Sequence, residues 1–213
     1  MRAARSVIKG VCGSVPRAVA SVLQVESRSL PLAVLKNGEL IFFDVKPVAV
    51  KAYGGYYWTR DKRPVLELKQ KTRGRFYLLL AYEARSGKVH WAFMPRKSSR
   101  YACQFMRQIR RWYPVAELWV ALDQDRAHPC NSRETQRVFR KLKLHWISLP
   151  KASPDDNPVE TIFSDIQRMI LDMSNDPDVR TTQRRISAHL RRHNRRVNRF
   201  IEIGYLGNTH KIS

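Results

Sequence analysis

Three acidic residues lie at the ends of apolar segments that are far apart in the chain. Asp44 and Asp123 close two runs of aliphatic and aromatic residues, and Glu160 follows a proline-rich turn at the expected start of a helix. Carboxylates delivered by separate core elements are suited to hold two divalent cations, because Mg²⁺ and Mn²⁺ prefer hard oxygen ligands. A pair of such ions about 4 Å apart activates the attacking oxygen and stabilises the leaving oxygen of a phosphodiester. The acids lie 79 and 37 positions apart, so only tertiary folding brings them together.

Each acid also has an ordinary structural interpretation. Glu160 stands three residues after Asn157, with Pro158 between them, which is the pattern of a capping box whose glutamate returns to the helix start. The other two acids suit local pairing, and the partners in that case are Lys46 or Lys51 for Asp44, and a turn with Asp125 for Asp123. The occurrence of all three acids after core elements of one basic chain favours the metal site.

The charge balance indicates a polyanionic partner. The 213 residues include 40 Lys and Arg against 18 Asp and Glu, a formal net charge of +22. Each phosphate that a cation neutralises releases condensed counterions, so nucleic acid is the expected ligand. Three widely spaced cysteines, Cys12, Cys103 and Cys130, argue against a disulfide framework and against a zinc cluster. The same cysteine usage favours a reducing, cytoplasmic compartment, and the lack of an apolar run long enough to span a bilayer predicts no membrane partner.

Hydrophobic periodicity predicts a mixed α/β fold, with a central sheet flanked by helices. A strand that ends near Asp44 comes first, and a basic amphipathic helix comes last. The elements expected in order are strands over 39–44, 75–82 and 88–93, a helix from Ser98 or Ser99 to Pro114, a strand over 117–123, a helix over about 131–142, a strand over 144–149, a helix over about 158–173 and the basic helix over 180–199.

Basic residues near these elements are candidate phosphate contacts, although solvated surface is the alternative for each of them. Residues 51–75 hold eight Lys or Arg interleaved with Tyr and Trp, a composition that suits either a nucleic-acid surface or a hairpin with its aromatic side chains packed inward. The individual candidates are Arg96, Lys97 and Arg100 before the first helix, and Arg191, Arg192, Arg195 and Arg196 in the last.

Three blocks resemble the catalytic blocks of DDE transposases of the Tc/mariner superfamily, and the bacterial insertion-sequence-630-like branch is the most similar. The blocks are Asp44 at the first strand, Leu-Asp-Gln-Asp-Arg-Ala-His over 122–128, and Leu-Pro-Lys-Ala-Ser-Pro-Asp-Asp-Asn-Pro-Val-Glu over 149–160. The resemblance covers residues 38–175. It implies an RNase H-like fold, two Mg²⁺ or Mn²⁺ ions, nicking of transposon ends, and strand transfer by attack of a 3′-hydroxyl on target DNA.

Carried over by position, the resemblance makes Asp44, Asp123 and Glu160 the catalytic metal ligands. It gives His128 a role near DNA, with loop packing as the equal alternative. The chain departs from the family pattern at Val45, Gln124 and Asp156, so Asp125, Asp155 and Asp156 are rival ligands.

The resemblance also implies the organisation of the chain and its partners. Residues 1–37 are expected to be a basic linker or a truncated DNA-binding remnant, 38–175 the catalytic domain, and 176–213 a basic helical extension. The expected partners are double-stranded DNA, a second copy of the chain on that DNA, and a separate helix-turn-helix component, all at the bacterial nucleoid. Two alternatives are an inactive DNA-binding protein derived from a transposase and an RNase H-like nuclease that only hydrolyses.

Overall fold

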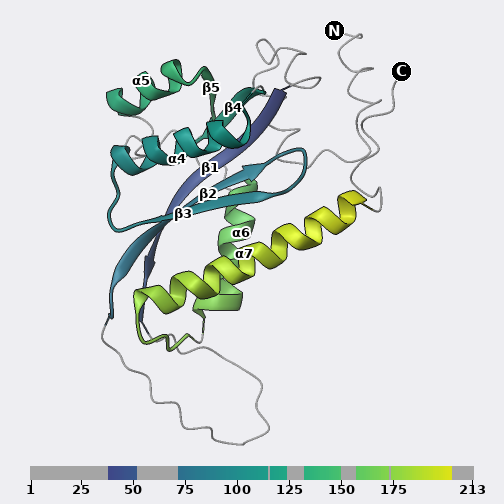
Figure 1. Cartoon of the computed structure of the whole chain (residues 1–213). Coiled ribbons are helices and arrows are strands. Elements are labelled where there is room, and N and C mark those ends of the chain that lie inside the picture. Colours follow the sequence, from purple (N-terminus) through teal and green to yellow (C-terminus); the bar gives the residue numbers. More distant parts are fainter. Residues whose placement is uncertain are drawn as a thin grey trace, which may run out of the picture.

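The computed structural model describes residues 38–51, 72–114, 116–123, 132–149, 157–172 and 174–202 (Figure 1). The predicted succession of strands and helices is confirmed in these ranges. The elements are β1 (Gly38–Ala49), β2 (Arg75–Glu83), β3 (Val89–Met94), α4 (Ser99–Trp112), β4 (Glu117–Leu122), α5 (Arg133–Lys141), β5 (Leu144–Ser148), α6 (Pro158–Ile166), the π-helical turn η3 (Gln167–Leu171) and α7 (Val179–Glu202). Predictions about residues 1–37, the segment 52–71, Asp125, His128, Asp155 and Asp156 lie outside the described residues.

The five strands form one mixed sheet in the order β3-β2-β1-β4-β5. The first three strands pair antiparallel, and β2 and β3 are joined by a tight turn in which Gly87 has a φ of +73°. On the other side, β4 pairs parallel to β1 and β5 pairs parallel to β4. Parallel neighbours need long crossovers, which here contain α4 and α5. The mixed α/β class is confirmed.

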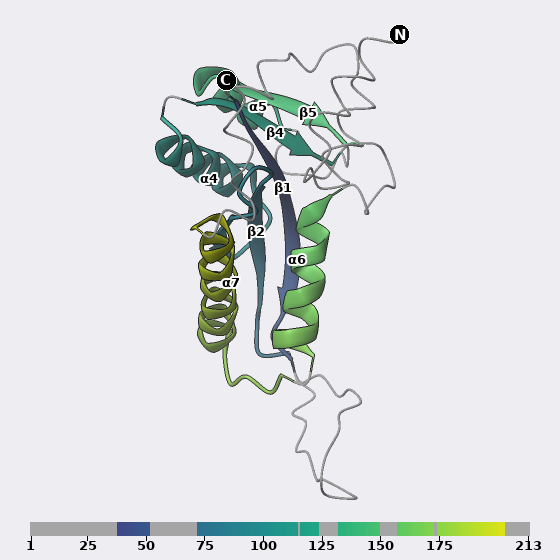
Figure 2. The ribbon, with the colours of Figure 1, turned by 90° about the vertical axis from the view of Figure 1, so that its right-hand side faces the viewer.

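Alternate side chains of β1 enter two separate apolar cores. Leu40 and Phe42 pack in one cluster with the buried side of α6, whereas Ile41 and Phe43 pack in another with α4. This alternation follows from the two-residue period of a strand. Figure 2 shows α4 and α6 on opposite sides of the sheet. The side chain of each β1 residue is therefore assigned to a face by its position in the strand.

The first strand is longer than predicted. The expectation that it ends near Asp44 is wrong, because β1 continues to Ala49, which pairs with Arg75 of β2. Lys46 and Pro47 interrupt the apolar pattern and made the strand look shorter. Proline is tolerated here because the pairing of β1 with β4 stops at Phe42, so this part of β1 pairs with β2 alone.

The basic helix α7 lies along the open edge of β3. Its residues Ile186 and Leu190 are buried in the same core as α6. The Asn194 side chain accepts a hydrogen bond from the Val89 amide at 2.9 Å and donates one to the Val89 carbonyl at 2.8 Å. The side chain thus supplies the polar partner that an edge strand lacks. Of the helices in the described ranges, none combines the length and the apolar composition needed to cross a lipid bilayer. The three-part division of the chain stays a prediction.

A partly buried polar network lies on the α4 face of the sheet. Tyr113 donates a hydrogen bond of 2.9 Å to Glu83, and His90 lies 2.8 Å from the same hydroxyl. Glu39 lies beside Glu83 and 3.7 Å from Arg85. Burial is the largest cause that raises the pKa of Glu39, followed by the charge of Glu83; the Arg85 charge lowers it, and a hydrogen bond with Glu83 raises it.

We predict that Glu39→Gln stabilises the protein at neutral pH. A carboxyl group whose pKa is raised by folding contributes stability when the pH is below its ordinary pKa of 4.5. This contribution is lost as the pH rises through the pKa of the group in the folded protein. Glutamine keeps a neutral side chain at every pH. The melting temperature of the variant should exceed that of the unaltered protein by about 2 °C at pH 7. Melting curves recorded from pH 4 to 8 should converge at the acid end, and a constant difference across this range would contradict the assignment.

Candidate active site

Asp44 and Asp123 lie at the same end of the parallel β1–β4 ladder. Phe42 and Ala121 form its last pair, Asp44 follows two positions later within β1, and Asp123 follows two positions after Ala121. Side chains two residues apart on a strand share a face. Phe42 and Ala121 are buried in the core that α6 covers, so both carboxylates belong to the α6 face. Asp44 is half-buried within β1, and Asp123 is exposed directly after the end of β4.

Glu160 reaches the same face from the first turn of α6. Asn157 caps this helix, with its side chain accepting a hydrogen bond of 3.1 Å from the Val159 amide, and Pro158 occupies the first turn. Val159 and Phe163 are buried against the sheet, which fixes the rotation of the helix. The capping-box interpretation had Glu160 returning to the helix start. The contacts of its carboxylate are instead with Asp44 and Lys46.

The three predicted acids meet at Glu160. Partial burial is the largest cause that raises the pKa of Glu160, and the charge of Asp44 is the next. The Lys46 ammonium lowers this pKa, whereas a hydrogen bond with Asp44 and the charge of Asp123 raise it. The structure therefore gathers one carboxyl group from each of three distant segments on one face of the sheet. Their roles as ligands and catalytic groups stay predictions.

Lys46 is a member of this cluster that the sequence analysis considered only as a partner of Asp44. Its Nζ lies 3.9 Å from Oε2 of Glu160 and 5.1 Å from the centroid of the Phe163 ring. Asp44 itself accepts a hydrogen bond of 2.6 Å from the Val45 amide. The available signal was the spacing, since a residue two positions after Asp44 on a strand shares its face.

The acids are chemically suited to divalent cations. They offer only hard oxygen donors, and their mutual repulsion is relieved when positive charge enters. Within the described residues, no three His, Cys, Asp or Glu side chains already converge closely enough to hold an ion. The Lys46 ammonium and the hydrogen bond between Glu160 and Asp44 balance the charge in this arrangement.

The individual Lys and Arg residues that are predicted to contact DNA are exposed, and they belong to other segments of the chain than the three acids. Arg96, Lys97 and Arg100 are exposed around the start of α4, where Ser98 caps the helix. On α7 the predicted arginines are all exposed, and Arg180 and Arg184 are exposed on preceding turns of the same helix. In the part of the chain that the structure describes, no acidic side chain pairs with the predicted α7 residues, which are Arg191, Arg192, Arg195 and Arg196.

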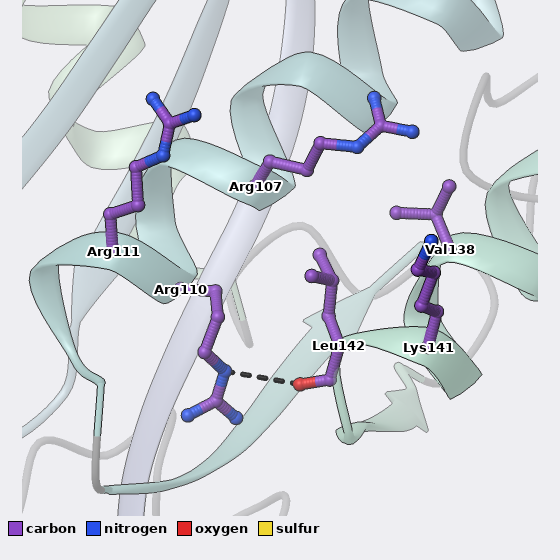
Figure 3. A pocket seen from close by; sticks show the side chains of 6 residues that line it. All are labelled: Arg107, Arg110, Arg111, Val138, Lys141 and Leu142. Carbon is purple, nitrogen blue, oxygen red and sulfur yellow. Dashed lines mark hydrogen bonds between the residues drawn. The ribbon is translucent and has the colours of Figure 1, made fainter.

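A pocket of about 310 Å³ lies between α4 and α5 (Figure 3). These helices pack on the face of the sheet opposite the one that α6 covers. Val138 and Leu142 contribute its apolar lining. The guanidinium of Arg110 donates to the carbonyls of Leu142, Tyr113, Ala116 and Lys143 at 2.8–3.1 Å. Arg110 therefore fastens the end of α4 to the turn that follows α5, and its donors are used within the protein.

The chain matches one protein family and is similar to several solved structures. The family described as DDE superfamily endonuclease matches residues 39–183. The chain is similar to a pre-cleavage Mos1 transpososome, with a TM-score of 0.60 and 11% identity over 88% of this chain and 59% of that chain. It is also similar to the Mos1 transposase paired-end complex with left transposon end, with a TM-score of 0.57 and 11% identity over 81% of this chain and 52% of that chain. A third similar structure, the Mos1 mariner paired end complex with Mn, gives a TM-score of 0.55 and 10% identity over 87% of this chain and 59% of that chain.

At these identities the likeness establishes the fold, and the predicted RNase H-like fold is confirmed. The chain spans little more than half the length of the Mos1 chains that it matches. No curated protein sequence matches it. The bacterial insertion-sequence-630-like branch stays a prediction.

We predict that Glu160→Gln removes the stabilisation that Mn²⁺ gives to the protein. An ion whose free concentration is ten times its dissociation constant adds about 1.4 kcal/mol to the free energy of unfolding. For a chain of this size, that gain raises the melting temperature by about 3–6 °C. The unaltered protein should show this increase in melting temperature, and Glu160→Gln should show little of it. The matched control is Glu117→Gln, which changes an exposed acid at the opposite end of β4. Equal increases in both variants would place the ion elsewhere.

Proposed function

Because the chain belongs to the DDE superfamily endonucleases, we propose that it contains the catalytic domain of a DNA transposase. The observation that carries the proposal is the meeting of Asp44, Asp123 and Glu160 on the α6 face of the sheet. The proposed reaction nicks the ends of a transposable element and then transfers the strand by attack of the released 3′-hydroxyl on target DNA. The branch proposed for it is the bacterial insertion-sequence-630-like branch, which locates it at the nucleoid.

The proposed ligands of two Mg²⁺ or Mn²⁺ ions are the three acids, with Asp44 and Asp123 on the sheet and Glu160 on α6. When bound, two such ions activate the attacking oxygen and stabilise the leaving oxygen of an in-line displacement. Strands β1 and β4 deliver the two aspartates to one end of their ladder, and α6 places Glu160 beside Asp44. Water or the 3′-hydroxyl serves as the nucleophile according to the step, so one site suffices for both reactions.

Double-stranded DNA is the proposed substrate and partner. The exposed arginines of α7 and the basic residues around the start of α4 supply positive charge to the phosphate backbone. Transposition joins two element ends to one target, so we propose a homodimer on DNA and a helix-turn-helix component that recognises the ends. His128 is proposed to contact DNA near Asp123.

We predict that Asp123→Asn abolishes metal-dependent nicking while DNA affinity changes by less than about twofold. Loss of a ligand removes several kcal/mol of transition-state stabilisation, which is about 1000-fold in rate. Nicking of a supercoiled substrate with Mg²⁺, together with DNA binding in Ca²⁺, measures both quantities. Glu117→Gln, at the other end of the same strand, should keep full activity. Cleavage retained by Asp123→Asn would remove this residue from the mechanism.

A pre-nicked DNA end with a free 3′-hydroxyl distinguishes strand transfer from hydrolysis. Joined product supports the transposase, whereas cleavage without joined product indicates a hydrolytic nuclease of the same fold. Salt-dependent DNA binding with no metal-dependent product from the unaltered protein would indicate an inactive, transposase-derived binding protein.

We predict that replacing the four α7 arginines by glutamine lowers the salt dependence of DNA binding. Each lost phosphate contact reduces the slope of log affinity against log salt by about 0.9, so four contacts would reduce it by about 3.6. The control carries the same charge change on exposed residues of the α4 and α5 face, which are Arg107, Arg111, Arg137 and Arg140. Equal slopes for the two variants would show that α7 makes no specific contribution.

A further inference from the structure

Two side chains of α6 together contact the positive charge of Lys46. Asp44 and Lys46 project on the α6 face of β1, and beyond Phe42 no β4 residue pairs with this part of the strand. The Lys46 ammonium lies over the ring of Phe163 and near the carboxylate of Glu160. Positions three residues apart on a helix are neighbours, so Glu160 and Phe163 present an anion and an aromatic face to the same cation.

The geometry of this ion pair differs from that of a structural clamp. Nζ of Lys46 and Oε2 of Glu160 are 3.9 Å apart, and the two side chains are 39% and 40% exposed. By contrast, Arg185 and Asp176 are 2.6 Å apart, and the Asp176 side chain is only 8% exposed. A loose and half-exposed pair contributes little to folding. Lysine also carries a compact charge on a flexible stem, so it can leave its partner without disturbing the backbone.

Resting on the proposed function, we propose that Lys46 is a positioning residue that substitutes for a divalent cation in the metal-free site. Its ammonium holds Glu160 beside Asp44 and balances the charge of the three acids. A divalent cation that binds to Glu160 would displace the Lys46 ammonium, so the two positive charges compete for one carboxylate. Lys46 thus keeps the site assembled before metal arrives and weakens the binding of the metal that displaces it.

The test measures Mn²⁺ binding to the full chain without DNA, by electron paramagnetic resonance of the free ion. Lys46→Met keeps an apolar stem over Phe163 and removes the charge, and it should tighten Mn²⁺ binding about fivefold, because a unit charge about 4 Å from a partly exposed ligand no longer opposes the ion. Lys46→Arg keeps the charge and should bind Mn²⁺ within about twofold of the unaltered protein. Lys141→Met, on α5 across the sheet, removes the same charge and should have no effect.

A second readout is the melting temperature without and with saturating Mn²⁺. Saturating Mn²⁺ should raise the melting temperature of Lys46→Met by more than that of the unaltered protein, because the variant binds the ion more tightly, whereas a purely structural lysine would leave the two increases equal. Lys46→Gln is the second neutral variant and should tighten Mn²⁺ binding in the same way. Unchanged or weaker Mn²⁺ binding by both neutral variants would overturn the proposal while leaving the catalytic site intact. Failure of the unaltered protein to bind Mn²⁺ would overturn the proposed function itself.

Discussion

The parallel pairing of β1 with β4 is the constraint on which the site depends. It brings Asp44 and Asp123 to the same end of the paired strands, because each follows two residues after the last pair of the ladder, Phe42 and Ala121. A slip of one residue in either strand would move one carboxylate to the α4 face. The register is protected by burial on both faces, since Leu40 and Phe42 enter one core and Ile41 and Phe43 enter the other. The positions of the acids are therefore set by the packing of apolar neighbours.

The same alternation separates two groups of acids that would otherwise repel one another. Glu39 belongs to the α4 face, where Glu83 and Tyr113 surround it, whereas Asp44 belongs to the α6 face. The first group is partly buried, which is the largest cause that raises the pKa of Glu39, while the Arg85 charge lowers this pKa. The second group is more open and includes the exposed Asp123. The proposed entry of ions and DNA requires this openness, so the two clusters differ in their surroundings although their residues are alike.

The elements of the fold could be predicted because each has a strong local pattern. Ser98 caps α4 and Ser132 caps α5, and the apolar residues of α6 recur at helical spacing. The limit of β1 could not be predicted in the same way. Lys46 and Pro47 break the pattern locally, and the strand continues because β2 pairs with it across the sequence. The strand propensity of residues 44–49 alone does not indicate that they pair with β2.

The three acids could be selected as candidates from the sequence, but their contacts in the fold could not. Resemblance to known catalytic blocks selected Asp44, Asp123 and Glu160, and the strand register then explained why two of them meet. The capping-box interpretation of Glu160 was equally consistent with the sequence, since Asn157 does cap the helix. Only the packing of Val159 and Phe163 decides that the Glu160 side chain turns toward β1.

A chain with a net charge of +22 must keep most of its cations away from the acids that we propose to bind metal. Among the described residues, Lys46 supplies the one positive charge that lowers the pKa of Glu160. The arginines of α7 are held outward because Ile186, Leu190 and the polar contact of Asn194 fix the rotation of that helix. Positive charge on such surfaces attracts the phosphate backbone over a distance of about 10 Å, whereas positive charge beside the acids would compete with the ions. The proposed binding of DNA and the proposed binding of metal therefore make opposite electrostatic demands, and the groups suited to each lie on separate elements of one fold.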